Sequence, residues 1–190
     1  MSPPTQLDED FIAHLEDLVR KRDTGALAAL RRGLGKPPGT VYEMFPHVQW
    51  AAAHARSRWE EDTYYILATL FAAWHQGRDN PVQTSLRNLG ASLRQWATTQ
   101  SGTTDENRLK SIESRFSALL AAHLHDLHNH LRHAVSLLRS ADVPVNWLQL
   151  LADLKAWNHP DRYVQREWAR AFWAPQPSQQ DQQTPVEETA

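Results

Sequence analysis

Apolar side chains recur at three- and four-residue intervals along most of the chain, the spacing that places them on one side of an α-helix. The clearest case is the run 143–173, where Trp147 and Leu154 belong to one helical stripe and Val164 and Trp168 to a second. An Asn-His-Pro sequence separates the two stripes, and proline disfavours continuation of a helix. Since four of the eight tryptophans lie in this run, we expect its two helices to fold back on each other and close the core.

Similar stripes predict about eight helices in all, and we find no alternation typical of strands. A helix near Leu86 is expected to be interrupted at Gly90, and another is expected to break near His123. The predicted fold is therefore an all-α compact bundle with N- and C-terminal helical halves and no sheet. The predicted boundaries are a flexible acidic N-terminus over 1–10, a single helical domain over 11–174 and a disordered, polar tail over 175–190.

The formal net charge of −2 conceals an uneven distribution. Six acids lie in two segments that carry no lysine or arginine, the first ten residues and the tail from Pro175. The chain between them has an excess of basic residues, and all but four of the 20 bases are arginines. A guanidinium presents a planar pair of donors that matches phosphate oxygens. Nucleic-acid binding is thus compatible with the composition, although surface arginines also serve solubility alone.

Cysteine is absent from the sequence, which excludes a disulfide framework and a thiolate metal site and fits a reducing compartment. No apolar run reaches the length of a membrane span, and the N-terminus lacks a basic region followed by an apolar one. We therefore expect a cytoplasmic protein with no signal peptide and no membrane contact.

Motifs for catalysis are weak. Five histidines lie between His123 and His133, but no two of them are four residues apart, as a helical zinc site requires. His125-Asp126 matches the pair that gives metal-dependent HD phosphohydrolases their name, without a convincing set of further ligands. Neither a nucleophile elbow nor a phosphate-binding glycine loop is present. We expect no catalytic residues, no metal and no cofactor.

Most tryptophans occupy positions in the predicted apolar stripes, where core packing is the ordinary role. Trp59 and Trp173 lie near the ends of predicted helices and stay open as candidates for stacking on bases.

The order of several stretches carries a family resemblance. VPVNWLQLLADLKAWNHPDRYVQREWARAFW, preceded by SIESRFSALLAAH and HLRHAVSLLRS, and with GALAALRRGLG near the N-terminus, resembles the CasB family. This family provides the small subunit of the type I-E CRISPR surveillance complex, Cascade. The segment 77–104 departs from the family pattern, and the acidic, Gln-rich tail lies outside the resemblance.

The resemblance implies a non-catalytic subunit that binds beside CasA and the CasC backbone. Two copies of this subunit would be present in the complex. Its implied role is to help hold the hybrid of CRISPR RNA and target DNA and the displaced strand, the R-loop. We predict phosphate contacts from eight side chains: Arg31, Arg32, Arg58, Arg94, Lys110, Arg115, Arg132 and Arg139. Of these, Arg31, Arg32, Arg115 and Arg132 are chosen from the stretches that resemble the family, and the other four are chosen on charge and placement alone.

Two other functions stay open at this point. One is an HD-type metal-dependent phosphohydrolase centred on His125 and Asp126, and the other is a helical scaffold that binds only proteins. Metal analysis would separate the first from a nucleic-acid-binding subunit, and DNA binding across a salt series would separate the second.

Overall fold

The computed structural model describes residues 3–100 and 106–173 of the chain, and within these residues it contains nine α-helices, one 3-10 helix and no strand. The elements are α1 (Gln6–Arg20), α2 (Thr24–Arg31), η1 (Tyr42–Met44), α3 (Phe45–Ala52), α4 (Arg58–Trp74), α5 (Leu89–Gln100), α6 (Glu106–Ala121), α7 (Leu124–Ser140), α8 (Trp147–Lys155) and α9 (Tyr163–Trp173). The predicted all-α fold is confirmed, with one helix more than expected. None of the helices in the described ranges combines the length and apolar character that a bilayer crossing demands.

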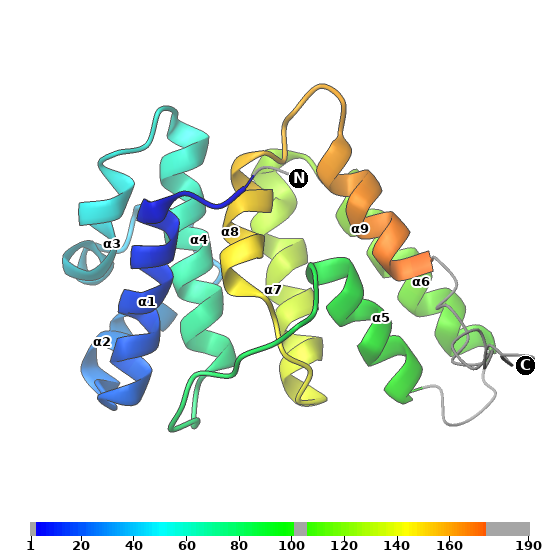
Figure 1. Ribbon diagram of the computed structural model, residues 1–190, viewed down its shortest axis with the longest axis horizontal. Coiled ribbons are helices and arrows are strands. Elements are labelled where there is room, and N and C mark those ends of the chain that lie inside the picture. The colour runs from blue at the N-terminus through cyan, green and yellow to red at the C-terminus, as the bar shows by residue number, and fades with distance from the viewer. Residues whose placement is uncertain (1–2, 101–105, 174–190) are drawn as a thin grey trace, which may run out of the picture.

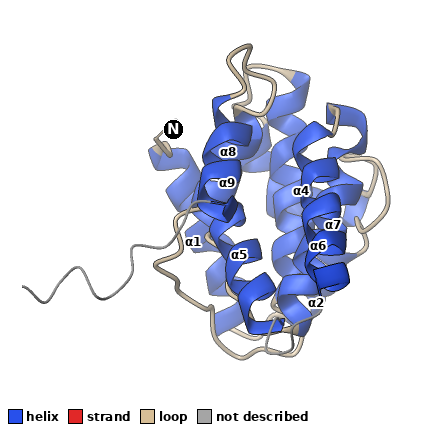
Figure 2. Ribbon diagram, turned by 90° about the vertical axis from the view of Figure 1, so that its right-hand side faces the viewer, coloured by secondary structure: helices blue, strands red, loops and turns tan. Residues whose placement is uncertain are grey.

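The helices form two halves joined by α7 (Figure 1). One half contains α1 to α4 with α8 beside them, and the other contains α5, α6 and α9. Helix α7 lies between them and packs against α4, α5 and α6. Its predicted stripe is buried, from Leu127 and Leu131 to Val135 and Leu138. In the view turned by 90°, the second half lies in front of the first (Figure 2).

Helix α4 forms the centre of the first half. Its predicted apolar stripe, which includes Tyr64, Leu67 and Phe71, is buried, but so are Tyr65 and Thr69 on its other sides. A helix that is buried all round is surrounded by other elements, and α4 indeed packs against α2, α3, α7 and α8. The residues along the middle of α4 are thus part of the core, and they fix the positions of the residues at the two ends of the helix.

The C-terminal run closes the core, though not as the predicted pair of helices folded back on each other. Helix α8 packs chiefly against α4, whereas α9 packs chiefly against α5. The two remain connected through Trp168, whose indole Nε1 donates to Asp153 at 2.6 Å and whose ring lies 5.0 Å from that of Trp157. The run therefore ties both halves together, while Trp173 at its end is 42% exposed.

Gly90 lies inside α5 and does not interrupt it. Asn88 begins this helix, because its side-chain oxygen accepts from the amide of Ala91 at 3.0 Å. A Cβ added to Gly90 would lie only 2.2 Å from the carbonyl oxygen of Trp168. The glycine therefore permits the backbones of α5 and α9 to approach closely, which explains its place within a helix.

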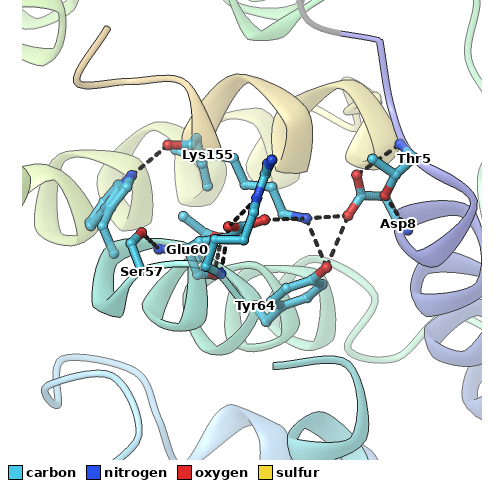
Figure 3. A network of polar contacts seen from close by, with 10 residues as sticks. Thr5, Asp8, Ser57, Glu60, Tyr64 and Lys155 are labelled. Atoms are coloured by element: carbon cyan, nitrogen blue, oxygen red, sulfur yellow. Dashed lines mark hydrogen bonds and ion pairs between the residues drawn. The ribbon is translucent and has the colours of Figure 1, made fainter. Parts of the chain in front are cut away.

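The expected flexible segment 1–10 is wrong from Gln6 onward, where α1 begins. Thr5 caps the helix by accepting from the amide of Asp8 at 3.3 Å. Asp8 is only 1% exposed and pairs with Lys155, and Tyr64 donates to it at 3.1 Å (Figure 3). A buried carboxylate needs such partners, and they hold the start of the chain on the core. The predicted tail over 175–190 lies outside the described residues.

Candidate nucleic-acid interface

Four cavities follow one another along α4 and α7, and we treat them together as one groove. The chain segment 33–39, which follows α2, forms a wall of two of them and contributes Leu34 to a third. Neighbouring cavities share lining residues: His128 joins the first two, Arg132 the next two, and Arg139 the last two. The cavities at the two ends measure about 440 and 450 Å³, and those between them are smaller, about 30 and 140 Å³.

Five cationic side chains line this groove, and we refer to it as the basic groove: Lys36, Arg58, Arg78, Arg132 and Arg139. His125 and His128 lie along it as well. Among the described residues that line the four cavities, Asp62 is the only acid. Cations that follow one channel can bind successive phosphates of a nucleic-acid backbone.

Arg132 marks the narrow middle of the basic groove. Gly35 lies over it with a φ of +72°, a conformation that glycine adopts without strain. A Cβ added at Gly35 would lie 2.8 Å from Nη1 of Arg132. The segment 33–39 therefore packs directly against the guanidinium of Arg132. This contact is possible because Gly35 has no side chain.

Arg139 and Arg78 lie at one end of the groove. Arg139 shares a cavity with Arg132, as their seven-residue spacing on one helix predicts, and donates to the carbonyl of Gln76 at 3.1 Å. Arg78 stacks over the ring of Trp74, 3.9 Å from its centroid, and pairs with Asp142 at 2.5 Å. Stacking on Trp74 orients the guanidinium of Arg78, and the hydrogen bond to Gln76 orients that of Arg139. Both side chains still line the groove.

Arg58 lies at the opposite end, in the first turn of α4. Its Nε is 3.1 Å from Asp62 and its Nη1 is 3.5 Å from Glu61, and the side chain stays 69% exposed. Exposed pairs at this spacing are weak, so the guanidinium can exchange these acids for another anion. Burial raises the pKa of the Asp62 carboxyl, and the charge of Arg58 opposes that rise.

Arg31 and Arg32 end α2 immediately before the wall segment, and neither lines the four cavities. Arg32 is exposed and pairs with Glu43 at 2.7 Å. These two predicted contacts therefore adjoin the wall segment in sequence but do not line the basic groove.

The other three predicted contacts lie in the second half of the molecule, away from the groove. Arg94 on α5 donates to the carbonyl of Phe172 at 2.7 Å, so it secures the last turn of α9. Arg115 on α6 lines a separate, mainly apolar cavity of about 500 Å³, and Lys110 is exposed on the same helix. The eight predicted residues thus do not share one surface.

The histidine-rich stretch divides between two sides of α7. His125 and His128 line the basic groove, whereas His130 and His133 line the cavity beside Arg115. In the part of the chain that the structure describes, no three His, Cys, Asp or Glu side chains gather as metal ligands would.

Sequence reasoning missed Lys36 and Arg78 as parts of the groove. Lys36 lies in a turn and Arg78 in a loop, where no helical spacing relates them to α7. Of the two tryptophans considered for stacking, Trp59 lines the groove with its Nε1 donating to Leu154 at 2.7 Å, and Trp173 packs against Phe116.

Known proteins share this fold and much of this sequence. The family model of the CRISPR-associated protein Cse2 matches residues 26–173. The CRISPR-associated protein Cse2 of Thermus thermophilus is 33% identical over 181 residues, which cover 94% of this chain and 97% of that protein.

Solved structures agree with these matches. CasB from Thermus thermophilus is 32% identical with a TM-score of 0.71, over 92% of this chain and all of that one. A chain of a CRISPR RNA-guided surveillance complex is 28% identical with a TM-score of 0.71, over 88% of this chain and 91% of its own. These matches confirm the predicted resemblance to CasB. The chain therefore belongs to the Cse2 family of CRISPR-associated proteins.

Proposed function

We propose that this protein is a non-catalytic, nucleic-acid-binding subunit of a type I-E surveillance complex in the cytoplasm. Its partners in this proposal are the CasA and CasC subunits, a second copy of itself, CRISPR RNA and target DNA. Membership of the Cse2 family and the likeness to a chain of a surveillance complex support the assignment.

The observation that carries the proposal is the basic groove, a row of neighbouring cavities with five cations and, among its described lining residues, a single acid. In RNA-guided recognition, base pairing with the guide reads the sequence, and the exchange of one duplex for another is nearly balanced in free energy. Contacts to phosphates that ignore sequence can therefore tip the balance toward the open R-loop. The groove would supply such contacts to the hybrid or to the displaced strand.

The test is a salt series with single-stranded and duplex DNA, for the wild type and an Arg132→Ala/Arg139→Ala variant. Removal of one phosphate-binding cation should reduce the slope of log K against log salt by about one. We expect the variant to show a slope about two units smaller than that of the wild type and to bind more weakly at low salt.

The matched control is Arg166→Ala/Arg170→Ala, which removes two exposed arginines of α9 that do not line the groove. If the slope falls as far in this control as in the groove variant, binding reflects net charge and the groove is not the interface. If the wild type binds neither DNA at low salt, the scaffold function is the better description.

A further inference from the structure

The groove contains one residue that phosphate binding does not explain. Asp62 lines the wide end near Arg58, together with Trp59, His125 and Asn129. A carboxylate repels phosphates, so its presence among five cations disfavours the backbone contacts proposed above. A group that donates hydrogen bonds would turn this carboxylate into a favourable contact.

The two oxygens of the Asp62 carboxylate differ. Oδ1 is fully buried and lies 3.1 Å from Nε of Arg58, but it accepts no hydrogen bond from the described residues. Oδ2 accepts no hydrogen bond from the described residues, although the side chain as a whole is 21% exposed and lines the cavity. An incoming donor can therefore reach one oriented acceptor.

Flat side chains line the same cavity as this acceptor. The indole of Trp59 is fixed by its hydrogen bond to Leu154, and the imidazoles of His125 and His128 line the same cavity. Its volume of about 440 Å³ lies in the range of small-molecule pockets. Aromatic rings in such a site stack on bases of unpaired strands.

We propose that the Asp62 cavity receives one unpaired nucleobase that carries an amino group, while the groove holds the adjoining phosphates. Cytosine, adenine and guanine each present an exocyclic amine to a carboxylate, whereas thymine presents carbonyl oxygens beside its single N–H. The subunit would then prefer amino-bearing bases over thymine at one position. This inference rests on the proposed function, because the strand reaches the cavity through the groove.

The experiment compares binding of oligo-dC and oligo-dT, each of about 20 nucleotides, at pH 8 and low salt by fluorescence anisotropy. One hydrogen bond to a charged acceptor corresponds to a preference of about ten-fold or more for oligo-dC in the wild type. Asp62→Asn should abolish this preference, since an amide can present either a donor or an acceptor to the base. The control Asp161→Asn removes an exposed carboxylate outside the groove and should keep it.

The outcomes separate the two proposals. Equal, salt-dependent binding of both oligonucleotides by the wild type leaves the phosphate groove standing and overturns the base site, with Asp62 then serving only as a partner of Arg58. A preference for oligo-dC that survives Asp62→Asn also overturns the base site.

A second measurement keeps the base site testable if the variant misfolds or if neither oligonucleotide binds. Wild-type protein is titrated with dCMP and with dTMP, and the NMR signals of the His125 and His128 rings are followed. Larger shifts at lower concentration with dCMP support the site, and equal or absent shifts refute it. The absence of oligonucleotide binding would refute the proposed function independently.

Discussion

Individual buried polar residues have partners that no local pattern indicates. Tyr64 reaches Asp8 across 56 positions of sequence, and Lys155 reaches it across 147. Burial raises the pKa of Asp8, but the hydrogen bonds from Lys155 and Thr5 and the charge of Lys155 outweigh this effect, so the pKa lies below its usual value. Sequence reasoning placed Asp8 in a flexible acidic segment, because an acid near a terminus is ordinarily solvated.

His75 gives the clearest prediction at the scale of one residue. It is buried and stacked on Phe71, with ring centroids 4.0 Å apart, and burial lowers its pKa from 6.5 to about 4. Between these pH values the unfolded chain binds more protons than the folded one, so His75 costs up to about 3 kcal/mol of stability on acidification. We expect His75→Phe to lose less stability than the wild type in urea titrations between pH 7 and 4.

Asp153 provides the opposite control for that experiment. Burial raises its pKa to about 6, against the hydrogen bonds from Trp168 and Gln149. The folded state therefore binds more protons between about pH 4 and 6, and Asp153 offsets part of the acid loss. The stability of Asp153→Asn should fall more steeply on acidification than that of the wild type. Parallel curves for the His75 variant and the wild type would refute the assignment of the acid loss to His75.

At the scale of elements, the period of apolar residues predicted the helices well and their partners poorly. The stripes of α4, α7, α8 and α9 are buried as expected. Helix α8 packs on α4 while α9 packs on α5, and the turn between them includes Arg162 with a φ of +47°. An apolar stripe says that a helix face is covered but not by which helix.

Gly90 tests the contact between α5 and α9. In an exposed helix, exchanging glycine for alanine stabilises by about 1 kcal/mol. At Gly90 the new methyl group would meet the backbone of Trp168, and overpacking costs about 1–3 kcal/mol or more. We expect Gly90→Ala to lower the free energy of unfolding by about 2 kcal/mol in urea titrations.

Gly25→Ala in α2 is the matched control, because its Cβ would make only an ordinary contact, 3.5 Å from Asp23. This variant should be neutral or slightly more stable than the wild type. A Gly90 variant as stable as the Gly25 variant would mean that α5 and α9 can separate without any decrease in stability.

On the scale of the whole molecule, the basic residues are distributed over both halves, and only some of them act as one set. Arg58, Arg132 and Arg139 meet in the basic groove, joined by the unpredicted Lys36 and Arg78. Arg94 instead bonds to the end of α9. Charge and family resemblance were sufficient to select these side chains as candidates. Only the tertiary structure shows which of them line the groove and which, like Arg94, bond to a helix end.

That distinction predicts opposite behaviour for two arginines. Arg94→Ala should lower the free energy of unfolding by about 2 kcal/mol, because it removes a charged hydrogen bond to Phe172. Its salt dependence of DNA binding should equal that of the wild type. Arg132→Ala should reduce the salt slope by about one unit and change stability by less than about 0.5 kcal/mol. Measuring both quantities for both variants checks the division, and a reduced slope in the Arg94 variant would contradict it.

The sequence by itself determined the all-α class, most helix positions and the family, because helical spacing and the order of motifs are local properties of the chain. It also indicated that Arg132 and Arg139 share a face, since they belong to one helix. The tertiary structure alone decided the burial of Asp8, the close approach at Gly90 and the assembly of the basic groove. Each of these joins side chains or backbones from different helices and loops, and their relative placement depends on how the whole core packs.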